Sequence, residues 1–364
     1  MPGLLAMVVG VATLSAQTNA PARPEPIARA IVSTGPTPNP ALLVGEKNAG
    51  RLAIIDPATL KVVARIPVGN QPHEVATDGE FAYISNSGAS GVTLVDVAAQ
   101  SRLPSIDMGV FGTFHGLWVA GGKLYISHEQ SRVLTRYNPA TARIEWVFGT
   151  GLGSHLLIVT EDERTIYLAS SSTTSMNIME MGGGRGGAAA RAGGAAGGAG
   201  AARRGGGGGG RGGWTISSFP AGTRMEGIDI SPDGKEFWAV SINDKKIIIV
   251  NIAEKKIVET FELPTVFTNR LKFTLDGKHV LMNELMGNQL FVYDAATRKE
   301  VKRIEIGAGG EGVFIDPNGT RAYYAVSAGN KLSVIDLPTL TVVGEVPDLQ
   351  NPDGMAWYVS KAAK

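Results

Sequence analysis

The sequence repeats itself about every 40 residues, and this period is the strongest constraint on its fold. Each repeat is marked by an acidic residue or an asparagine that ends an apolar segment and precedes a turn, as in IIDPATL and VIDLPTL. The marker residues are Asp56, Asp96, Asn138, Asn251, Asp294 and Asp336. Neighbouring markers are 40 to 43 residues apart, except for a gap of 113 residues between Asn138 and Asn251. A 32-residue tract of Gly, Ala and Arg, Gly182 to Gly213, lies in that gap, and removing it leaves room for two repeats.

Each repeat contains four short strand patterns separated by turn signals, which is typical of a meandering antiparallel sheet. Residues 71–96, QPHEVATDGEFAYISNSGASGVTLVD, show three of these patterns around the turn at Asp78-Gly79. Seven repeats of this kind predict an all-β fold, a seven-bladed β-propeller with four antiparallel strands in each blade.

The two ends of the chain predict how the ring closes. Near the N-terminus, ALLVGE, RLAIID and VVARIP have the pattern of second, third and fourth strands, whereas GMAWYV at residues 354–359 is a lone first strand. Pairing the C-terminal strand with the N-terminal three completes one blade, and an open ring would leave unpaired strand edges. We therefore expect a single propeller domain over residues 41–360.

The segments outside this domain suggest export. Leu4 to Leu14 is an apolar run of signal-peptide length with small residues after it, so residues 1–16 are predicted to be a signal peptide and the protein periplasmic or secreted. Residues 17–40 are rich in Pro, Ala and Thr and are expected to form an extended leader. No other apolar run reaches the roughly 20 residues of a membrane span.

The tract over residues 182–213 is predicted to be a disordered insertion in the fourth blade, because it has too little apolar surface to offset the entropy of ordering. It replaces a turn between third and fourth strands, on the face opposite the starts of the first strands. Its five arginines could contact nucleic acid or another anionic polymer. In an exported protein a tolerated insertion is the favoured interpretation, and the formal net charge of +1 creates no overall field that attracts nucleic acid.

Composition also removes some classes of site. The chain has no cysteine, which excludes disulfides, thiolate metal ligands and a cysteine nucleophile. Its hydrophobic content of 43% is ample for a packed core. We expect the protein to be a monomer.

Several segments resemble a known family of repeats. YISN, YISH, YLAS and YYAVS, together with SPDGKEFWAVS and VIDLPTLTVVGEVP, are similar to YVTN-type propeller repeats, and the resemblance covers residues 41–360. That family includes exported proteins with no known activity, and related propellers include lactonases and lyases. One blade, FHGLWVAGGKLYISHEQSRV at residues 114–133, also resembles repeats of the virginiamycin B lyase group. The resemblance implies the fold and leaves the function open.

Aligning the seven repeats places one polar or titratable residue at the start of every first strand. These residues are His73, His115, His155, Glu226, Asn269, Glu311 and Asp353. Because the first strands of a propeller line its central channel, the seven should encircle one mouth of the channel in that order. Arg270, which follows Asn269, is a further candidate for ligand binding.

Three kinds of chemistry fit this predicted ring. His73, His115 and His155 could hold a transition metal, or the carboxylates and Asn269 could hold Mg²⁺ or Ca²⁺. His115 could also act as a general base opposite Glu311. The alternative to all three is that polar side chains at a wet channel mouth are simply solvated.

Two functions follow from these patterns. The first is an exported, non-enzymatic module that binds a small molecule or a protein partner at the polar mouth. The alternative is a lyase or lactonase-like hydrolase that uses a divalent metal ion and a histidine base at the same place.

Two further expectations concern packing. His128 should lie in a loop on the same face, and the tryptophans should form core between blades. The tryptophans are Trp118, Trp146, Trp214, Trp238 and Trp357.

Overall fold

The computed structural model describes residues 28–29, 32–87, 89, 91–151, 153–182, 213–265 and 267–361. The expected signal peptide at residues 1–16 and the interior of the Gly/Ala/Arg tract, residues 183–212, lie outside the described residues. Within the described residues, regular structure is almost entirely β, with two short 3-10 helices at Lys47–Ala49 and Gly109–Phe111. In the same residues, no helix has the length and apolarity needed to cross a membrane.

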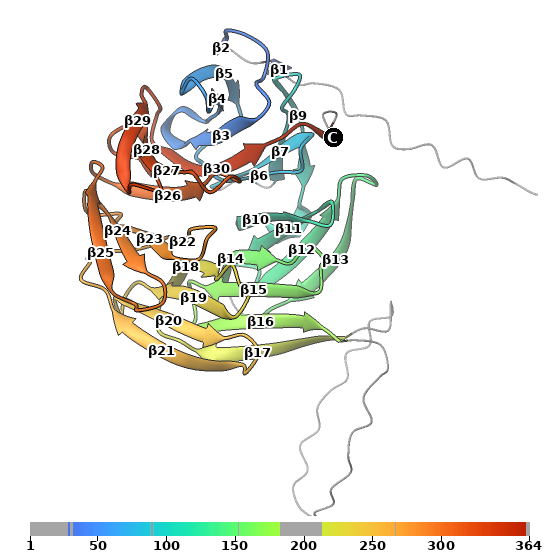
Figure 1. The fold of residues 1–364 in the computed structure, drawn as a ribbon. Helices are drawn as coiled ribbons and strands as arrows, with labels where there is room; N and C mark the ends of the chain where they lie inside the picture. The colour runs from blue at the N-terminus through green and yellow to red at the C-terminus, as the bar shows by residue number, and fades with distance from the viewer. Residues whose placement is uncertain are drawn as a thin grey trace, which may run out of the picture.

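Seven antiparallel sheets surround a central axis, as Figure 1 shows. Blade 2 contains β6 (Pro72–Thr77), β7 (Phe81–Asn86), β8 (Gly91–Asp96) and β9 (Ser101–Asp107). Blade 3 contains β10 (Phe114–Ala120), β11 (Lys123–His128), β12 (Val133–Asn138) and β13 (Arg143–Gly149). Blade 4 contains β14 (Ser154–Val159), β15 (Thr165–Ser170), β16 (Ser175–Met181) and β17 (Trp214–Pro220). Blade 5 contains β18 (Met225–Ile230), β19 (Glu236–Ser241), β20 (Lys246–Asn251) and β21 (Lys256–Glu262). Blade 6 contains β22 (Leu271–Phe273), β23 (His279–Asn283), β24 (Gln289–Asp294) and β25 (Glu300–Glu305). Blade 7 contains β26 (Gly310–Ile315), β27 (Arg321–Val326), β28 (Lys331–Asp336) and β29 (Thr341–Val346).

Blade 1 is built from both ends of the chain, which confirms the predicted closure. Its strands are β30 (Pro352–Tyr358), β3 (Ala41–Glu46), β4 (Arg51–Asp56) and β5 (Lys61–Pro67), in order from the channel outward. β30 and β3 are antiparallel, with Ala41 opposite Tyr358 and Val44 opposite Met355. In Figure 1 they lie side by side, the first in red and the second in blue.

The core lies between the blades. Second and third strands such as β7 and β20 are buried over nearly their whole length, because each blade is covered on both faces by its neighbours. Between blades 5 and 6, for example, Trp238, Ile249 and Phe273 belong to one buried cluster. Burying an aliphatic or aromatic side chain stabilises a fold by about 1.5–3 kcal/mol, so the ring depends on contacts between neighbouring blades.

Two short strands lie within the segment expected to be an extended leader. β1 (Ala28–Arg29) pairs with β9 at the outer edge of blade 2, and β2 (Val32–Ser33) pairs with β5 at the outer edge of blade 1. Each covers part of an outer edge that would otherwise present unpaired backbone groups to another chain.

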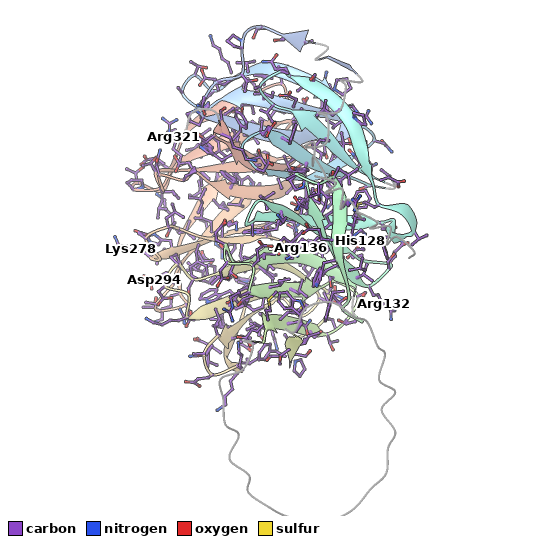
Figure 2. The ribbon with its side chains drawn as sticks, turned by 90° about the vertical axis from the view of Figure 1, so that its right-hand side faces the viewer. His128, Arg132, Arg136, Lys278, Asp294 and Arg321 are labelled. Atoms are coloured by element: carbon purple, nitrogen blue, oxygen red, sulfur yellow. The ribbon has the colours of Figure 1, made fainter. Side chains whose placement is uncertain are left out.

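The ring has two distinct faces. The connections that lead into the first strands lie on the rim face, together with the loops between second and third strands. The turns between first and second strands and those between third and fourth strands lie on the turn face. In Figure 2, His128 and Arg132 lie toward the rim face at the right, while Lys278 and Arg321 lie toward the turn face at the left. The backbone N–H of Gly182 donates to the carbonyl of Gly213 (2.9 Å), extending the β16–β17 hairpin. The Gly/Ala/Arg tract therefore starts and ends on the turn face.

Removing Gly354 to Lys364 should leave unpaired edges on β3 and open the ring. We expect aggregation, or loss of a single cooperative unfolding transition in thermal melts followed by circular dichroism. Removing only the last three residues is the matched control and should change neither property. A longer truncation that stays monomeric and melts as the full chain does would contradict this account of closure.

Replacing residues 182–213 by Asn-Gly should join Met181 and Trp214 through a two-residue hairpin turn. Each doubling of a loop's length costs only about 0.6 kcal/mol of closure entropy, so the free energy of unfolding should be unchanged or slightly higher. Urea unfolding of the shortened and full-length proteins measures the difference. A marked loss of stability would show that the tract contributes to the folded ring.

Candidate functional site

A repeated β-bulge positions the residues at the starts of the first strands. In blade 2, His73 and Glu74 together face the single residue Ser85 of the second strand. Blade 6 differs, because its first strand β22 begins at Leu271 and Asn269 lies just before it. A bulge of this kind bends the strand and re-aims its side chains. The same shift in register occurs at His115, His155, Glu226, Glu311 and Asp353.

Side chains of the second strands hold these bulges and tie neighbouring blades together. The Ser127 hydroxyl accepts a hydrogen bond from the backbone N–H of Gly116 (2.9 Å) and donates one to the carbonyl of His155 in the next blade (2.6 Å). The side-chain amide of Asn283 donates to the backbone carbonyl of Glu311 (3.0 Å), which joins blade 6 to blade 7.

Glycines at the second bulge position let the blades approach closely. A Cβ atom on Gly116 would lie 2.6 Å from the carbonyl oxygen of His155, and one on Gly354 would overlap the carbonyl of His73. The mouth on the rim face is therefore narrow, and the side chains of adjacent blades meet there.

The three histidines of the predicted ring lie on adjacent blades with their rings in contact. The ring centroids of His73 and His115 are 4.3 Å apart with the planes at 80°, and those of His115 and His155 are 3.7 Å apart at 33°. His155 is buried, whereas His73 and His115 are partly exposed. They form one continuous row along an arc of the mouth.

Asp353 continues this row on the other side of His73. Nδ1 of His73 donates a hydrogen bond to Oδ2 of Asp353, and the Lys47 ammonium lies 2.9 Å from the same oxygen. Lys47 also reaches Oε1 of Glu311 at 3.4 Å. The side chain of Asp353 is only 1% exposed, so this pairing is largely shielded from solvent.

Ion pairs and an amide contact hold the remaining arc. Arg270 Nη2 lies 2.8 Å from Glu74 Oε1, and Arg224 Nε lies 2.9 Å from Glu226 Oε1. The side-chain oxygen of Asn269 accepts a hydrogen bond from a neighbouring asparagine amide. The structure therefore brings the predicted residues together, with Asn269 held by another side chain and Arg270 paired with Glu74.

Three buried polar atoms in the ring have no hydrogen-bond partner among the described residues. They are Nδ1 of His115, Nδ1 of His155 and Oδ1 of Asp353. Leaving such an atom unpaired costs about 1–3 kcal/mol, so buried polar atoms are normally satisfied. These atoms mark positions where water, an ion or a ligand can supply the missing contact.

Burial and neighbouring charge shift the pKa values of the three histidines in different directions. Burial disfavours the charged form of His73, but the Asp353 carboxylate outweighs this effect and raises its pKa. Burial, and next the adjacent imidazoles, hold the pKa of His115 well below its usual value. Burial and the Arg270 guanidinium do the same to the pKa of His155. Near neutral pH, His115 and His155 are therefore uncharged, which is the state in which an imidazole binds a metal.

The two carboxylates beside Lys47 also differ. The charges of His73 and Lys47 outweigh burial and lower the pKa of Asp353. Burial, and next the charge of Asp353, raises the pKa of Glu311. Asp353 is therefore the fixed negative charge at this point, and Glu311 takes up a proton more readily than an ordinary glutamate.

The channel beneath the ring forms a cavity of about 640 Å³. Glu74, Arg270 and Asp353 line its upper end, and Glu161 and Lys272 lie near its other end at the turn face. The wall between the two ends is apolar and includes Trp118, Leu156, Ile228, Phe314, Met355 and Trp357. The volume is within the range of about 300–1,000 Å³ that small-molecule sites occupy.

Two sequence expectations need correction. Trp118 and Trp357 line this channel as well as packing against core, whereas Trp238 is fully buried between blades as expected. His128 ends strand β11 and is fully buried, with Nε2 2.9 Å from the Thr135 hydroxyl. Burial lowers the pKa of His128 to about 4. It supports blade 3 and does not belong to the mouth.

Sequence reasoning missed Glu74 and Lys47. Glu74 occupies the second bulge position, where four other blades have glycine, so its departure from that pattern was a usable signal. Lys47 lies in a loop between second and third strands, and nothing in its local sequence distinguishes it. Only the closed ring brings it to Asp353 and Glu311.

Comparisons with known proteins agree with this fold. No protein-family model and no curated protein matches the chain. A functionally unknown protein from Desulfotomaculum acetoxidans superposes with a TM-score of 0.67 at 11% identity, over 88% of this chain and 99% of that one. A candidate 6-phosphogluconolactonase from Bacteroides uniformis gives 0.63 at 13% identity, over 88% and 99%. Dihydro-heme d1 dehydrogenase NirN, in complex with DHE, gives 0.59 at 15% identity, over 90% and 68%. At these identities the likeness shows the seven-bladed propeller fold alone.

The stability of the apo protein should fall as the pH drops below about 6.5. Unfolded His115 and His155 take up protons there while the folded residues stay neutral, so each steepens the loss by up to about 1.4 kcal/mol per pH unit. His73 acts in the opposite direction, because its pKa is higher in the folded protein than in the unfolded chain. Its charge stabilises the folded state at low pH, and this contribution is lost only as the pH rises through the raised pKa.

Urea unfolding between about pH 5 and pH 6.5, with a chelator present, tests this with the double variant His115→Gln/His155→Gln. The variant should show a shallower pH dependence, and the residual slope belongs to the buried His128. Equal slopes in the two proteins would mean that the folded histidines titrate normally.

Proposed function

We propose that this protein is a binding module that holds a small amphiphilic molecule in its central channel. The observation that carries the proposal is the cavity of about 640 Å³, which has an apolar wall and a charged upper end. The apolar part of the ligand would lie against the channel wall, and its polar group would meet the ring on the rim face.

The ring indicates what kind of polar group fits. Oδ1 of Asp353 is buried and has no partner in the part of the chain that the structure describes, and as a carboxylate oxygen it needs a hydrogen-bond donor. Arg270 is already paired with Glu74, so it is not available as a free cation for an anionic ligand. A neutral polar group that carries an N–H or O–H donor therefore suits the site better than a carboxylate or a phosphate.

The proposal includes export and the YVTN-like family. The apolar run from Leu4 to Leu14 supports a signal peptide, and the repeated YISN-type segments support the family. Among proteins of this fold, NirN is known in complex with a ligand, DHE. That is consistent with a propeller serving as a ligand-binding scaffold here.

One observation favours a second function, a metal-dependent lyase or lactonase-like hydrolase. His115 is uncharged near neutral pH, as a general base must be, and Glu311 has the raised pKa of a proton donor. His73 and Asp353 lie between these two residues in the row. They could act together only on a substrate that spans that distance, so binding remains the primary proposal.

The neutral apolar amine N-phenyl-1-naphthylamine is a suitable probe of the channel. It should bind with a stoichiometry of one, and its fluorescence should be excited by energy transfer from Trp118 and Trp357. The variant Leu156→Trp places an indole across the channel and should weaken binding at least tenfold without lowering the melting temperature appreciably.

The matched control is Val301→Trp on β25, where the side chain is half-exposed on an outer strand. It adds the same indole far from the channel and should leave binding unchanged. The proposal is wrong if the probe fails to bind the unmodified protein, or if Leu156→Trp and Val301→Trp bind it equally well.

A further inference from the structure

Two imidazoles and one carboxylate converge at the junction of blades 2 and 3. One ligand atom from each of His73, Glu74 and His115 lies within 4.8 Å of the other two. Ligands of a tetrahedral ion with bonds of about 2 Å are roughly 3.3 Å apart. The three side chains therefore need only small rotations to share one ion.

We propose that His73, Glu74 and His115 form a binding site for a divalent first-row transition metal. This set differs from the three histidines expected from sequence, because Glu74 replaces His155. Two imidazoles with one carboxylate and an open position suit zinc or ferrous iron. Magnesium and calcium prefer oxygen ligands throughout, so they should bind poorly.

Asp353 prepares His73 for this role. Its carboxylate accepts the hydrogen bond from Nδ1 of His73, which fixes the imidazole orientation and leaves Nε2 as the available ligand atom. Metal-bound histidines commonly have such a carboxylate partner on the other ring nitrogen. Asp353 is thus a positioning residue that acts through His73.

Arg270 and Ser85 fix Glu74 in a similar way. The guanidinium of Arg270 holds Oε1 of Glu74 at 2.8 Å, and the Ser85 hydroxyl accepts the backbone N–H of Glu74 at 3.0 Å. Arg270 therefore holds one oxygen of the carboxylate, while Ser85 fixes the backbone that carries the side chain. Within the described part of the chain the other carboxylate oxygen, Oε2, has no such contact, so it can turn toward a metal.

His155 lies beside the open position. Its ring packs against His115, it is 6% exposed, and its Nδ1 has no partner among the described residues. The unpaired Nδ1 of His115 is a further buried atom that a metal would satisfy. With His115 bound to the metal, Nδ1 of His155 could accept a hydrogen bond from metal-bound water.

The charge around the site suits a dication. The ring contains four carboxylates, Glu74, Glu226, Glu311 and Asp353, against three cationic side chains, Lys47, Arg224 and Arg270. A histidine that binds a metal is neutral, so with His73 bound the four carboxylates exceed the three cationic side chains, and a dication would offset that negative charge. This inference uses the same ring as the proposed function but does not require a ligand in the channel.

The test is a calorimetric titration of the chelator-treated full chain with Zn²⁺, and anaerobically with Fe²⁺. One equivalent of metal should bind. Glu74→Gln, His73→Gln and His115→Gln should each weaken binding at least 100-fold, and Asp353→Asn should weaken it about 10–100-fold. Co²⁺ should give visible absorption bands of a site with nitrogen and oxygen ligands, and Glu74→Gln should change those bands.

Two controls separate this site from other sources of binding. His279→Gln removes a histidine at the turn face, and Glu226→Gln removes a ring carboxylate outside the proposed set. His279→Gln should leave the affinity unchanged, and Glu226→Gln should weaken binding far less than Glu74→Gln, because it removes one ring charge but no ligand. Melting temperatures show which variants fold, and Glu74→Gln replaces a partly exposed side chain, so it remains usable if a histidine variant is unstable.

Three outcomes would overturn the proposal. These are absence of stoichiometric binding, binding that survives Glu74→Gln and His73→Gln, and Ca²⁺ binding as tight as Zn²⁺ binding. The channel variant Leu156→Trp should bind metal normally. Loss of probe binding with metal binding intact, or the reverse, therefore shows which of the two proposals fails.

Discussion

The pairing of β30 with β3 is the interaction on which the rest of the structure depends. It joins the two ends of the chain into blade 1 and removes the exposed edges of an open ring. It also brings Asp353, from the last strand, into contact with His73 of blade 2 and Lys47 of blade 1. The contact that closes the fold and the contact that organises the mouth are therefore made by the same strand.

This closure sets the electrostatics of the mouth. Imidazole rings only 3.7–4.3 Å apart cannot all be charged without strong repulsion. The Asp353 carboxylate stabilises the charge on His73, while burial keeps His115 and His155 neutral. The row therefore combines one imidazole whose charged form is stabilised with two neutral imidazoles, and the neutral pair retains nitrogen atoms without partners among the described residues. The proposed metal would make use of these nitrogen atoms, and the proposed channel ligand would use Oδ1 of Asp353.

Much of the fold could be predicted from the sequence because the 40-residue period repeats markers such as Asp56 and Asp336 at the same place in each blade. The ring of residues from His73 to Asp353 could be placed in order for the same reason. The contacts inside the ring could not, because they depend on bulges and on close approach at glycines such as Gly354. Lys47 reaches the site only across the closure, and Trp118 and Trp357 face a channel whose width the repeat pattern does not encode.

The most direct test of this account is nuclear magnetic resonance of ¹⁵N-labelled histidines in the metal-free protein during a pH titration. Single substitutions assign the five imidazoles. The account predicts that His73 titrates above its usual pKa of about 6.5 and that His115 and His155 stay neutral well below it. In Asp353→Asn, the pKa of His73 should fall. Three histidines that titrate together near 6.5, unaffected by Asp353→Asn, would contradict the claim that ring closure organises the mouth.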